Sequence, residues 1–201
     1  MSKDYPVPAE YLERETEVKK SRFIARVAPV ASRDEVKTWL EQAWRDHPDA
    51  RHVCWAYQIG RPGAAAEAAM NDDGEPSGTA GKPILSVIQH KDMGDVLVMV
   101  IRYFGGIKLG AGGLVRAYAG AAESVLSAVP RAVQQPMMNA TVTMDFADEQ
   151  ALRHWCDVHD GVVESVDYGP TVSARVSMPE HRVADFTAFC DAQKLDYGFD
   201  R

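Results

Sequence analysis

The chain has 201 residues, a length that accommodates one large domain or two small ones. Its composition, 46% hydrophobic and 25% charged, is that of an ordinary globular protein and excludes disordered and fibrous classes. The net charge of −7 argues against a protein that coats nucleic acid or an anionic membrane. That charge is uneven, because residues 1–135 hold 17 basic and 17 acidic side chains, whereas residues 136–201 hold 5 and 12. The asymmetry predicts two parts with different surfaces.

Cysteine usage and the N-terminus bear on the compartment. Cys54, Cys156 and Cys190 are too few, and odd in number, for a disulfide framework, which favours a reducing compartment. The charged N-terminus is not a signal peptide. The longest apolar run, residues 96–101, is far shorter than the roughly 20 residues of a membrane span. We therefore expect a soluble, cytoplasmic protein that does not enter a membrane.

Periodicity and breaker residues divide the first part of the chain into short elements. In chain order they predict a frayed or edge segment (1–17), a strand (21–30), a helix (32–47), a strand (52–60), a long loop (61–83), a short helix (83–89), a buried strand (96–103), a Gly-rich turn (104–113) and a helix (114–130). The first helix begins with the capping-box pattern Ser32-x-x-Glu35. The loop of residues 61–83 has no periodicity, and loops of this length are usually functional or mobile.

The remainder of the chain follows a different order. It predicts a linker (131–137), a strand (140–146), a helix (148–158), two strands (162–168 and 171–178), a helix (179–193) and a short terminal strand. The last helix has a second capping-box pattern, Ser177-x-x-Glu180. The order β-α-β-β-α-β is the ferredoxin-like pattern.

The acidic loop of residues 71–83 is the most unusual segment. Its polar side chains are three carboxylates and two hydroxyls, namely Asp72, Asp73, Glu75, Ser77 and Thr79. Carboxylates could hold Mg²⁺, and glycine-rich amides could cradle an anion. The spacing nevertheless fails the templates of a P-loop, an EF-hand and a nucleophile elbow. The alternative is a surface loop whose acids cap its own amides.

A second candidate site is the glycine-rich segment of residues 102–118, where a buried strand ends and a helix begins. Free amides and the dipole at a helix N-terminus favour an anion such as a phosphate of RNA. The candidate anion-binding residues are Lys82, Arg102, Lys108, Gly112, Gly113 and Arg116, with Arg22 as a possible addition. The segment is not a dinucleotide-binding fingerprint, because the third glycine position holds Val115. In the alternative interpretation, these glycines only permit close packing.

Metal and stacking sites are weakly indicated. His52 with Cys54, and His154 with Cys156 and His159, lack the closed ligand count of a zinc site. We interpret the first set as a half-buried pair on a strand and the second as a helix face. The aromatic residues do not cluster between basic ones as a platform for stacking single strands would. No metal site is predicted from these residues.

Four motifs resemble those of the IMPACT family. They are Glu15 with Lys19-Lys20-Ser21-x-Phe23, His52-x-Cys54-x-Ala56-Tyr57, the whole of residues 72–81, and the whole of residues 102–118. The resemblance implies a two-domain α+β fold. Residues 1–135 would resemble the second domain of ribosomal protein S5. Residues 136–201 would be ferredoxin-like, similar to domain III or V of the translocating elongation factor.

The resemblance also implies a role in translation, which eukaryotic relatives regulate. Our main hypothesis is a non-enzymatic, translation-associated regulator that binds RNA or a ribosomal surface through its first domain and needs no cofactor. A second hypothesis is an enzyme acting on a small phosphorylated or nucleotide substrate, with Mg²⁺ on the acidic loop. A third is a protein-binding module that uses the same loop. The sequence leaves the ligand and the oligomeric state open.

Overall fold

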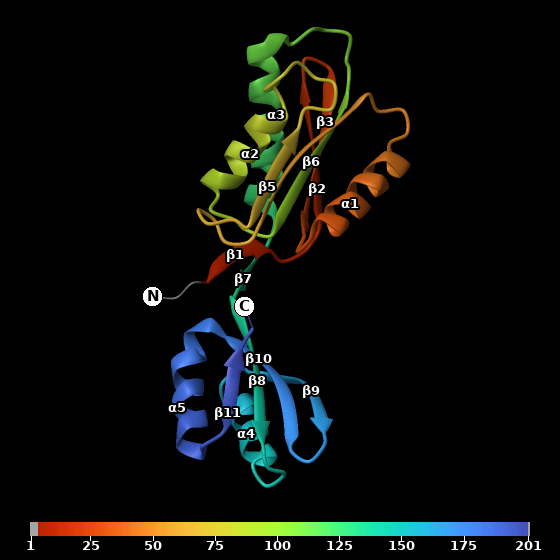
Figure 1. The fold of residues 1–201 in the computed structure, drawn as a ribbon. Coiled ribbons are helices and arrows are strands. Elements are labelled where there is room, and N and C mark those ends of the chain that lie inside the picture. Colours follow the sequence, from red (N-terminus) through yellow and green to blue (C-terminus); the bar gives the residue numbers. More distant parts are fainter. Residues whose placement is uncertain (1–3, 201) are drawn as a thin grey trace. The chain divides into compact units, whose positions relative to one another are not determined.

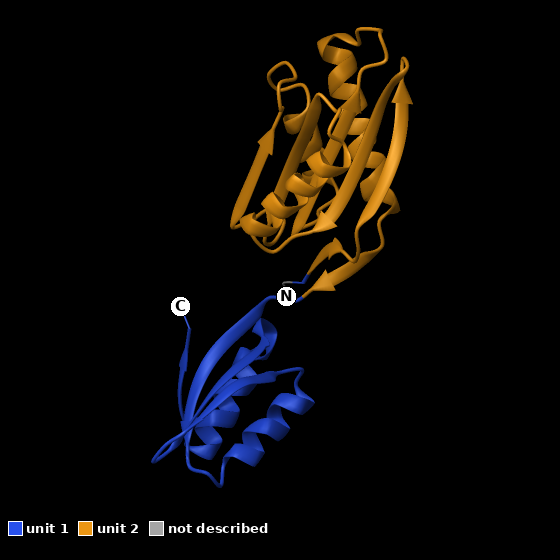
Figure 2. Cartoon of the chain, turned by 90° about the vertical axis from the view of Figure 1, so that its right-hand side faces the viewer, with its two compact units in different colours: residues 1–4, 135–201 blue, residues 5–134 orange. Residues whose placement is uncertain are grey.

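The computed structural model describes residues 4–200, which form two compact units (Figures 1 and 2). One unit is Tyr5–Gln134, and the other contains the chain from Gln135 onward. Each unit has helices, an antiparallel sheet and its own buried core. The expected two-domain α+β fold is confirmed.

The first unit is built around a five-stranded antiparallel sheet with the strand order β2-β3-β6-β4-β5. Its elements are β1 (Tyr5–Pro8), β2 (Leu12–Val18), β3 (Ser21–Pro29), α1 (Arg33–Asp46), β4 (His52–Ile59), β5 (Glu67–Asn71), α2 (Gly81–His90), β6 (Val96–Tyr103), α3 (Gly110–Ala128) and β7 (Arg131–Gln134). Helices α2 and α3 cover one face of the sheet, and α1 covers the other (Figure 1).

Strand β6 is the centre of this sheet, as its unbroken apolar sequence predicts for a strand buried on both faces. Val98 and Val100 face the core beneath α2 and α3, whereas Met99 and Ile101 face the core beneath α1. Arg102 therefore lies on the α2–α3 side, at the end of the strand. This alternation brings a charged group to the edge of an otherwise apolar layer.

The second unit has the ferredoxin-like order of elements. They are β8 (Met137–Met144), α4 (Glu149–Val158), β9 (Val162–Tyr168), β10 (Val172–Pro179), a 3₁₀ turn η1 (Glu180–Arg182), α5 (Val183–Gln193) and β11 (Asp196–Phe199). The sheet order is β11-β8-β10-β9, and all of its pairs are antiparallel. Its core joins the sheet to Leu152 and Trp155 of α4 and to Phe186 of α5.

The predicted loop of residues 61–83 is wrong in two places. Strand β5 lies within it and pairs with β4 from Ile59↔Glu67 to Trp55↔Asn71, and α2 begins at Gly81. The sequence of β5 has weak strand propensity, but the neighbouring edge of β4 supplies hydrogen-bonding partners that override it. The predicted linker of residues 131–137 is also wrong, because β7 pairs with β1 and β8 begins at Met137.

Of the two predicted capping boxes, only the first gives a side-chain cap, and there the Glu35 carboxylate accepts from the amide of Ala31 and not from that of Ser32. Ser32 Oγ accepts a hydrogen bond from the amide of Glu35 over 3.3 Å at the start of α1. Ser177 instead lies inside β10, where it pairs with Val162 of β9, and no side chain caps η1 or α5. Sheet pairing thus overrides the local capping pattern at Ser177-x-x-Glu180.

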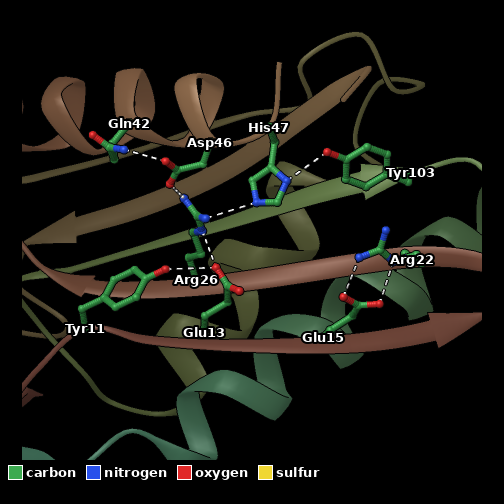
Figure 3. A network of polar contacts seen from close by, with 9 residues as sticks. All are labelled: Tyr11, Glu13, Glu15, Arg22, Arg26, Gln42, Asp46, His47 and Tyr103. Atoms are coloured by element: carbon green, nitrogen blue, oxygen red, sulfur yellow. Dashed lines mark hydrogen bonds and ion pairs between the residues drawn. The ribbon is translucent and has the colours of Figure 1, made fainter. Parts of the chain in front are cut away.

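A polar network ties β2, β3 and α1 together on the α1 side of the sheet (Figure 3). At its centre Arg26, only 6% exposed, donates to Glu13 (2.7 Å), Asp46 (2.8 Å) and His47 Nε2 (3.1 Å). Because arginine only donates, His47 Nε2 must accept, which places the imidazole proton on Nδ1, 2.9 Å from the Tyr103 hydroxyl. Burial and the charge of Arg26 lower the pKa of His47 below its ordinary value.

This arrangement predicts that acid weakens the network. A lowered pKa means that the unfolded chain binds the proton more readily, so the contribution of His47 is fully present above about pH 6.5 and is lost as the pH falls below it. Between about pH 7.5 and 5.5, the free energy of unfolding measured in urea should fall by about 1 kcal/mol more for the wild type than for His47→Gln. The glutamine carbonyl accepts from Arg26 without titrating.

The matched control is His90→Gln at the exposed end of α2. It should leave the pH dependence of stability as it is in the wild type. An equal pH dependence for His47→Gln and the wild type would show that the Arg26–His47 contact does not couple to folding.

Candidate functional site

The acidic loop and the glycine-rich segment meet at one cleft in the first unit, with a volume of about 360 Å³. Because β4 and β6 are antiparallel, the start of β4 and the end of β6 share one edge of the sheet, where His52 pairs with Arg102. Glu75 enters this cleft from the loop between β5 and α2. Phe104 and Lys108 enter it from the turn that precedes α3.

Asp72 organises the acidic loop. Its carboxylate accepts hydrogen bonds from the amides of Gly78 (2.8 Å), Ala80 (3.0 Å) and Gly81 (2.8 Å). Burial raises the pKa of this carboxyl, but these three hydrogen bonds hold it below its ordinary value. Asp72 thus caps the loop and the start of α2, as the alternative interpretation of the sequence describes.

Asp73 and Thr79 also act within the loop. The Asp73 carboxylate accepts from the amide of Val53 (2.7 Å), and its carbonyl lies 2.8 Å from His52 Nδ1. The Thr79 hydroxyl donates to a carbonyl of the loop over 2.6 Å, and Ser77 is exposed. These contacts fasten the loop to β4 and leave Glu75 as its one carboxylate that lines the cleft.

Glu75 forms the buried floor of the cleft with Arg102 and Tyr118. Its side chain is only 4% exposed, and Oε1 accepts from Arg102 Nη1 over 2.6 Å and from the Tyr118 hydroxyl over 2.7 Å. Tyr118 projects from the buried face of α3. An ion pair and a hydroxyl from three separate elements therefore satisfy each other beneath the cleft.

Arg102 retains unused hydrogen-bonding capacity. Its guanidinium lies near two rings, 5.6 Å from the centroid of Phe23 and 5.7 Å from that of Phe104. The side chain is 8% exposed, and Nε is buried without a hydrogen-bond partner within residues 4–200. Arg102 as a residue lines the cleft, whereas this nitrogen is itself inaccessible to solvent.

Cys54 lies next to these residues and has an unreactive thiol. Its Sγ donates to the carbonyl of Asp72 over 3.0 Å, and burial raises the pKa of the thiol to about 12. Burial likewise raises the pKa of Tyr118 far above its ordinary value. Both groups are therefore protonated at neutral pH, so Cys54 is not a nucleophile and Tyr118 is a neutral donor.

The N-terminus of α3 borders the cleft, where its amides and two nearby cations provide positive charge. The helix has 19 residues, starts at Gly110 with φ of +72° and has no side-chain cap, so its first amides are open to a ligand. Lys108 and Arg51 are exposed beside it. Neither forms an ion pair with any residue between 4 and 200.

The structure separates the residues predicted to bind an anion. Arg102 and Lys108 line the cleft, whereas Lys82 lines a different groove of about 620 Å³ between α2 and α3. Arg116 is exposed on α3 and is not part of the cleft lining. Gly112–Gly113 lies in the first turn of α3, where Gly110 and not this pair borders the cleft. Arg22 is held by Glu15 in a separate ion pair (Figure 3).

Three residues of the site were missed in the sequence. Arg51 precedes β4 without any motif of its own, and Tyr118 reads as a member of the apolar stripe of α3. Phe104 lies between Arg102 and Lys108 in the sequence, which is a local signal for a ring beside basic residues. In the cleft this single ring does lie among basic side chains.

Neither a metal-binding cluster nor a membrane-spanning helix occurs among residues 4–200. Residues 4–200 contain no group of three or more His, Cys, Asp or Glu side chains arranged to hold a metal ion. The three cysteines are buried and free. Within the same span, every helix is too short or too polar to cross a bilayer.

Family comparisons agree with the motifs. The Impact N-terminal domain family matches residues 19–126, and a domain family of unknown function, DUF1949, matches residues 142–189. The chain is 36% identical to the IMPACT family member YigZ of Escherichia coli over 182 residues, which are 90% of this chain and 89% of YigZ. It is 37% identical to Protein IMPACT of Xenopus laevis over 95 residues, covering 46% of this chain and 30% of that protein.

The likeness extends to three-dimensional structure. A crystal structure described as that of a hypothetical protein superimposes with a TM-score of 0.80 at 34% identity, over 98% of this chain and 97% of the other. Sequence and fold agree over both units. The chain therefore belongs to the IMPACT family.

Proposed function

We propose that the protein binds a phosphate of RNA in the translation apparatus, at the cleft between the acidic loop and α3. One observation carries the proposal: the uncapped start of a 19-residue helix shares a cleft with two cations that have no counter-ion within residues 4–200. Helix amides and the macrodipole favour an anion, and Arg51 and Lys108 add full positive charges to the same cleft.

The charge distribution supports the same choice. Residues 1–135 are neutral overall, whereas residues 136–201 have 5 basic and 12 acidic side chains. The acidic second unit repels phosphate, so an RNA ligand is directed to the first unit. The resemblance of both domains to ribosome-associated domains supports RNA of the translation apparatus, and hence a cytoplasmic location.

The test is RNA binding as a function of salt. Wild-type affinity should fall as salt rises, and Lys108→Ala should lower the salt slope by about 0.7–0.9, which is about a 10-fold loss near 0.1 M salt. Arg51→Ala should act in the same way. Fluorescence anisotropy of a labelled single strand measures both quantities.

The matched control is Lys37→Ala, which removes another exposed positive charge from α1 on the opposite face of the sheet. Its affinity and salt slope should equal those of the wild type. Absence of RNA binding by the wild type at about 50 mM salt would eliminate the proposed function.

A second candidate is an enzyme acting on a small phosphorylated substrate. The observation that favours it is Glu75, a carboxylate in the cleft floor whose orientation is held by Arg102 and Tyr118. Such a group can act as a base toward a bound ligand. Mg²⁺ has fewer available ligands than the sequence suggested, because Asp72 and Asp73 already accept hydrogen bonds from backbone amides. Calorimetric titration with Mg²⁺ and nucleotide tests this alternative.

A further inference from the structure

We propose that Phe104 stacks on a nucleobase, so that the cleft takes one unpaired nucleotide and the protein prefers single-stranded to duplex RNA. This inference rests on the proposed function, since it adds a base to the phosphate at α3. It is carried by the ring's exposure, by its support from Arg102, and by the size of the cleft.

Phe104 is 53% exposed and borders a cleft lined by both charged and apolar side chains. The Arg102 guanidinium lies 5.7 Å from its ring centroid and is itself packed against Phe23. The buried ion pair with Glu75 holds Arg102 in place. One side of the ring is thus supported from within the protein, which prepares the ring for stacking with little loss of entropy.

The size of the cleft limits the ligand to a single nucleotide. Its volume of about 360 Å³ lies at the lower end of the range of about 300–1,000 Å³ for small-molecule sites. A base inside a duplex is already stacked and cannot reach a side chain, whereas loops, bulges and ends offer splayed bases. A phosphate at the start of α3 and a base on Phe104 therefore require an unpaired nucleotide.

The charges beside the ring favour a nucleotide over a protein side chain. Lys108 lies four residues beyond Phe104 in the same turn, and Arg51 borders the cleft from the position just before β4. Apolar side chains also line the cleft, among them Leu109 and Leu114, and they suit the flat face of a base. A ring that shares its cleft with cations suits a ligand that has both an aromatic face and a phosphate.

The experiment compares a single-stranded RNA with a fully paired duplex of the same length. Phe104→Ala should weaken single-strand binding by about 5- to 100-fold, with an unchanged salt slope. Phe104→Trp should restore the affinity. Duplex binding should be weaker than single-strand binding in the wild type and unaffected by either substitution. A 2-aminopurine in the single strand should lose fluorescence on binding the wild type but not Phe104→Ala.

The matched control is Phe146→Ala, which removes a similarly exposed phenylalanine (58%) from the acidic second unit and should leave RNA binding unchanged. If Phe104→Ala binds like the wild type while Lys108→Ala still weakens binding, base stacking is overturned and phosphate binding stands. Equal affinity of the wild type for single strand and duplex would likewise overturn base stacking and leave phosphate binding standing. If the wild type binds neither RNA, both proposals fail together, and a protein partner becomes the better explanation of the exposed ring.

Discussion

Replacing Glu75 by alanine is expected to lower the free energy of unfolding by about 3–5 kcal/mol. The substitution leaves the guanidinium of Arg102 buried without its carboxylate and removes the acceptor of the Tyr118 hydroxyl. A buried charge that has lost its partner destabilises a protein by far more than the intact ion pair stabilises it. Urea unfolding followed by tryptophan fluorescence reports the loss, because Trp39, Trp44 and Trp55 all lie in the first unit.

Two comparisons isolate the buried charge as the cause. Glu15→Ala breaks the exposed pair with Arg22, whose side chains are 46% and 49% exposed, and should change stability by less than about 1 kcal/mol. The double substitution of Glu75 and Arg102 by methionine should recover most of the loss, since an apolar pair needs no counter-charge. A double variant as unstable as Glu75→Ala would contradict this account.

Gly105→Ala is expected to destabilise the first unit by about 3 kcal/mol or more. A Cβ at this position would lie 2.0 Å from the carbonyl carbon and oxygen of Lys20 and 2.4 Å from the Ser21 nitrogen. These are backbone atoms of the β2–β3 turn, and no rotamer change relieves the overlap. The amide of Gly105 also donates to Ser21 Oγ over 3.1 Å, so movement of the turn breaks that contact.

The matched control is Gly120→Ala in α3, where an added Cβ meets nothing within 4 Å. Alanine has the higher helix propensity, so this substitution should stabilise the protein by about 1 kcal/mol. If the two substitutions change the free energy of unfolding in opposite directions, the effect at Gly105 comes from its close contact with the backbone of the turn and not from the flexibility that all glycines share. A neutral Gly105→Ala would show that the turn is free to move away.

The contact at Gly105 explains why two distant motifs occur together. Lys19 and Lys20 have φ of +48° and +65°, as the two central residues of a tight β-hairpin turn require. The turn they form packs on the first glycine after Phe104. The Lys-Lys-Ser motif therefore supports the turn that carries Phe104 and Lys108, although neither lysine lines the cleft.

The acidic loop shows where sequence reasoning reached its limit. Composition identified the carboxylates but could not divide them into structural and site residues. Asp72 and Asp73 bind backbone amides of the loop, α2 and β4, whereas Glu75 turns toward Arg102. That division depends on loop conformation, which includes positive φ values at Asp73 and Gly74 that residue type alone does not specify.

The uneven charge, the family motifs and most helices and strands were determined by the sequence itself, because each depends on residues close together in the chain. Strand β5 and the failed cap at Ser177 were not, because pairing with a neighbouring strand overrides local propensity. Only the tertiary structure decides that Glu75 meets an arginine 27 residues away and a tyrosine 43 residues away. The register between β4 and β6 and the packing of α3 bring these groups together beside Phe104, and neither is encoded in any single segment.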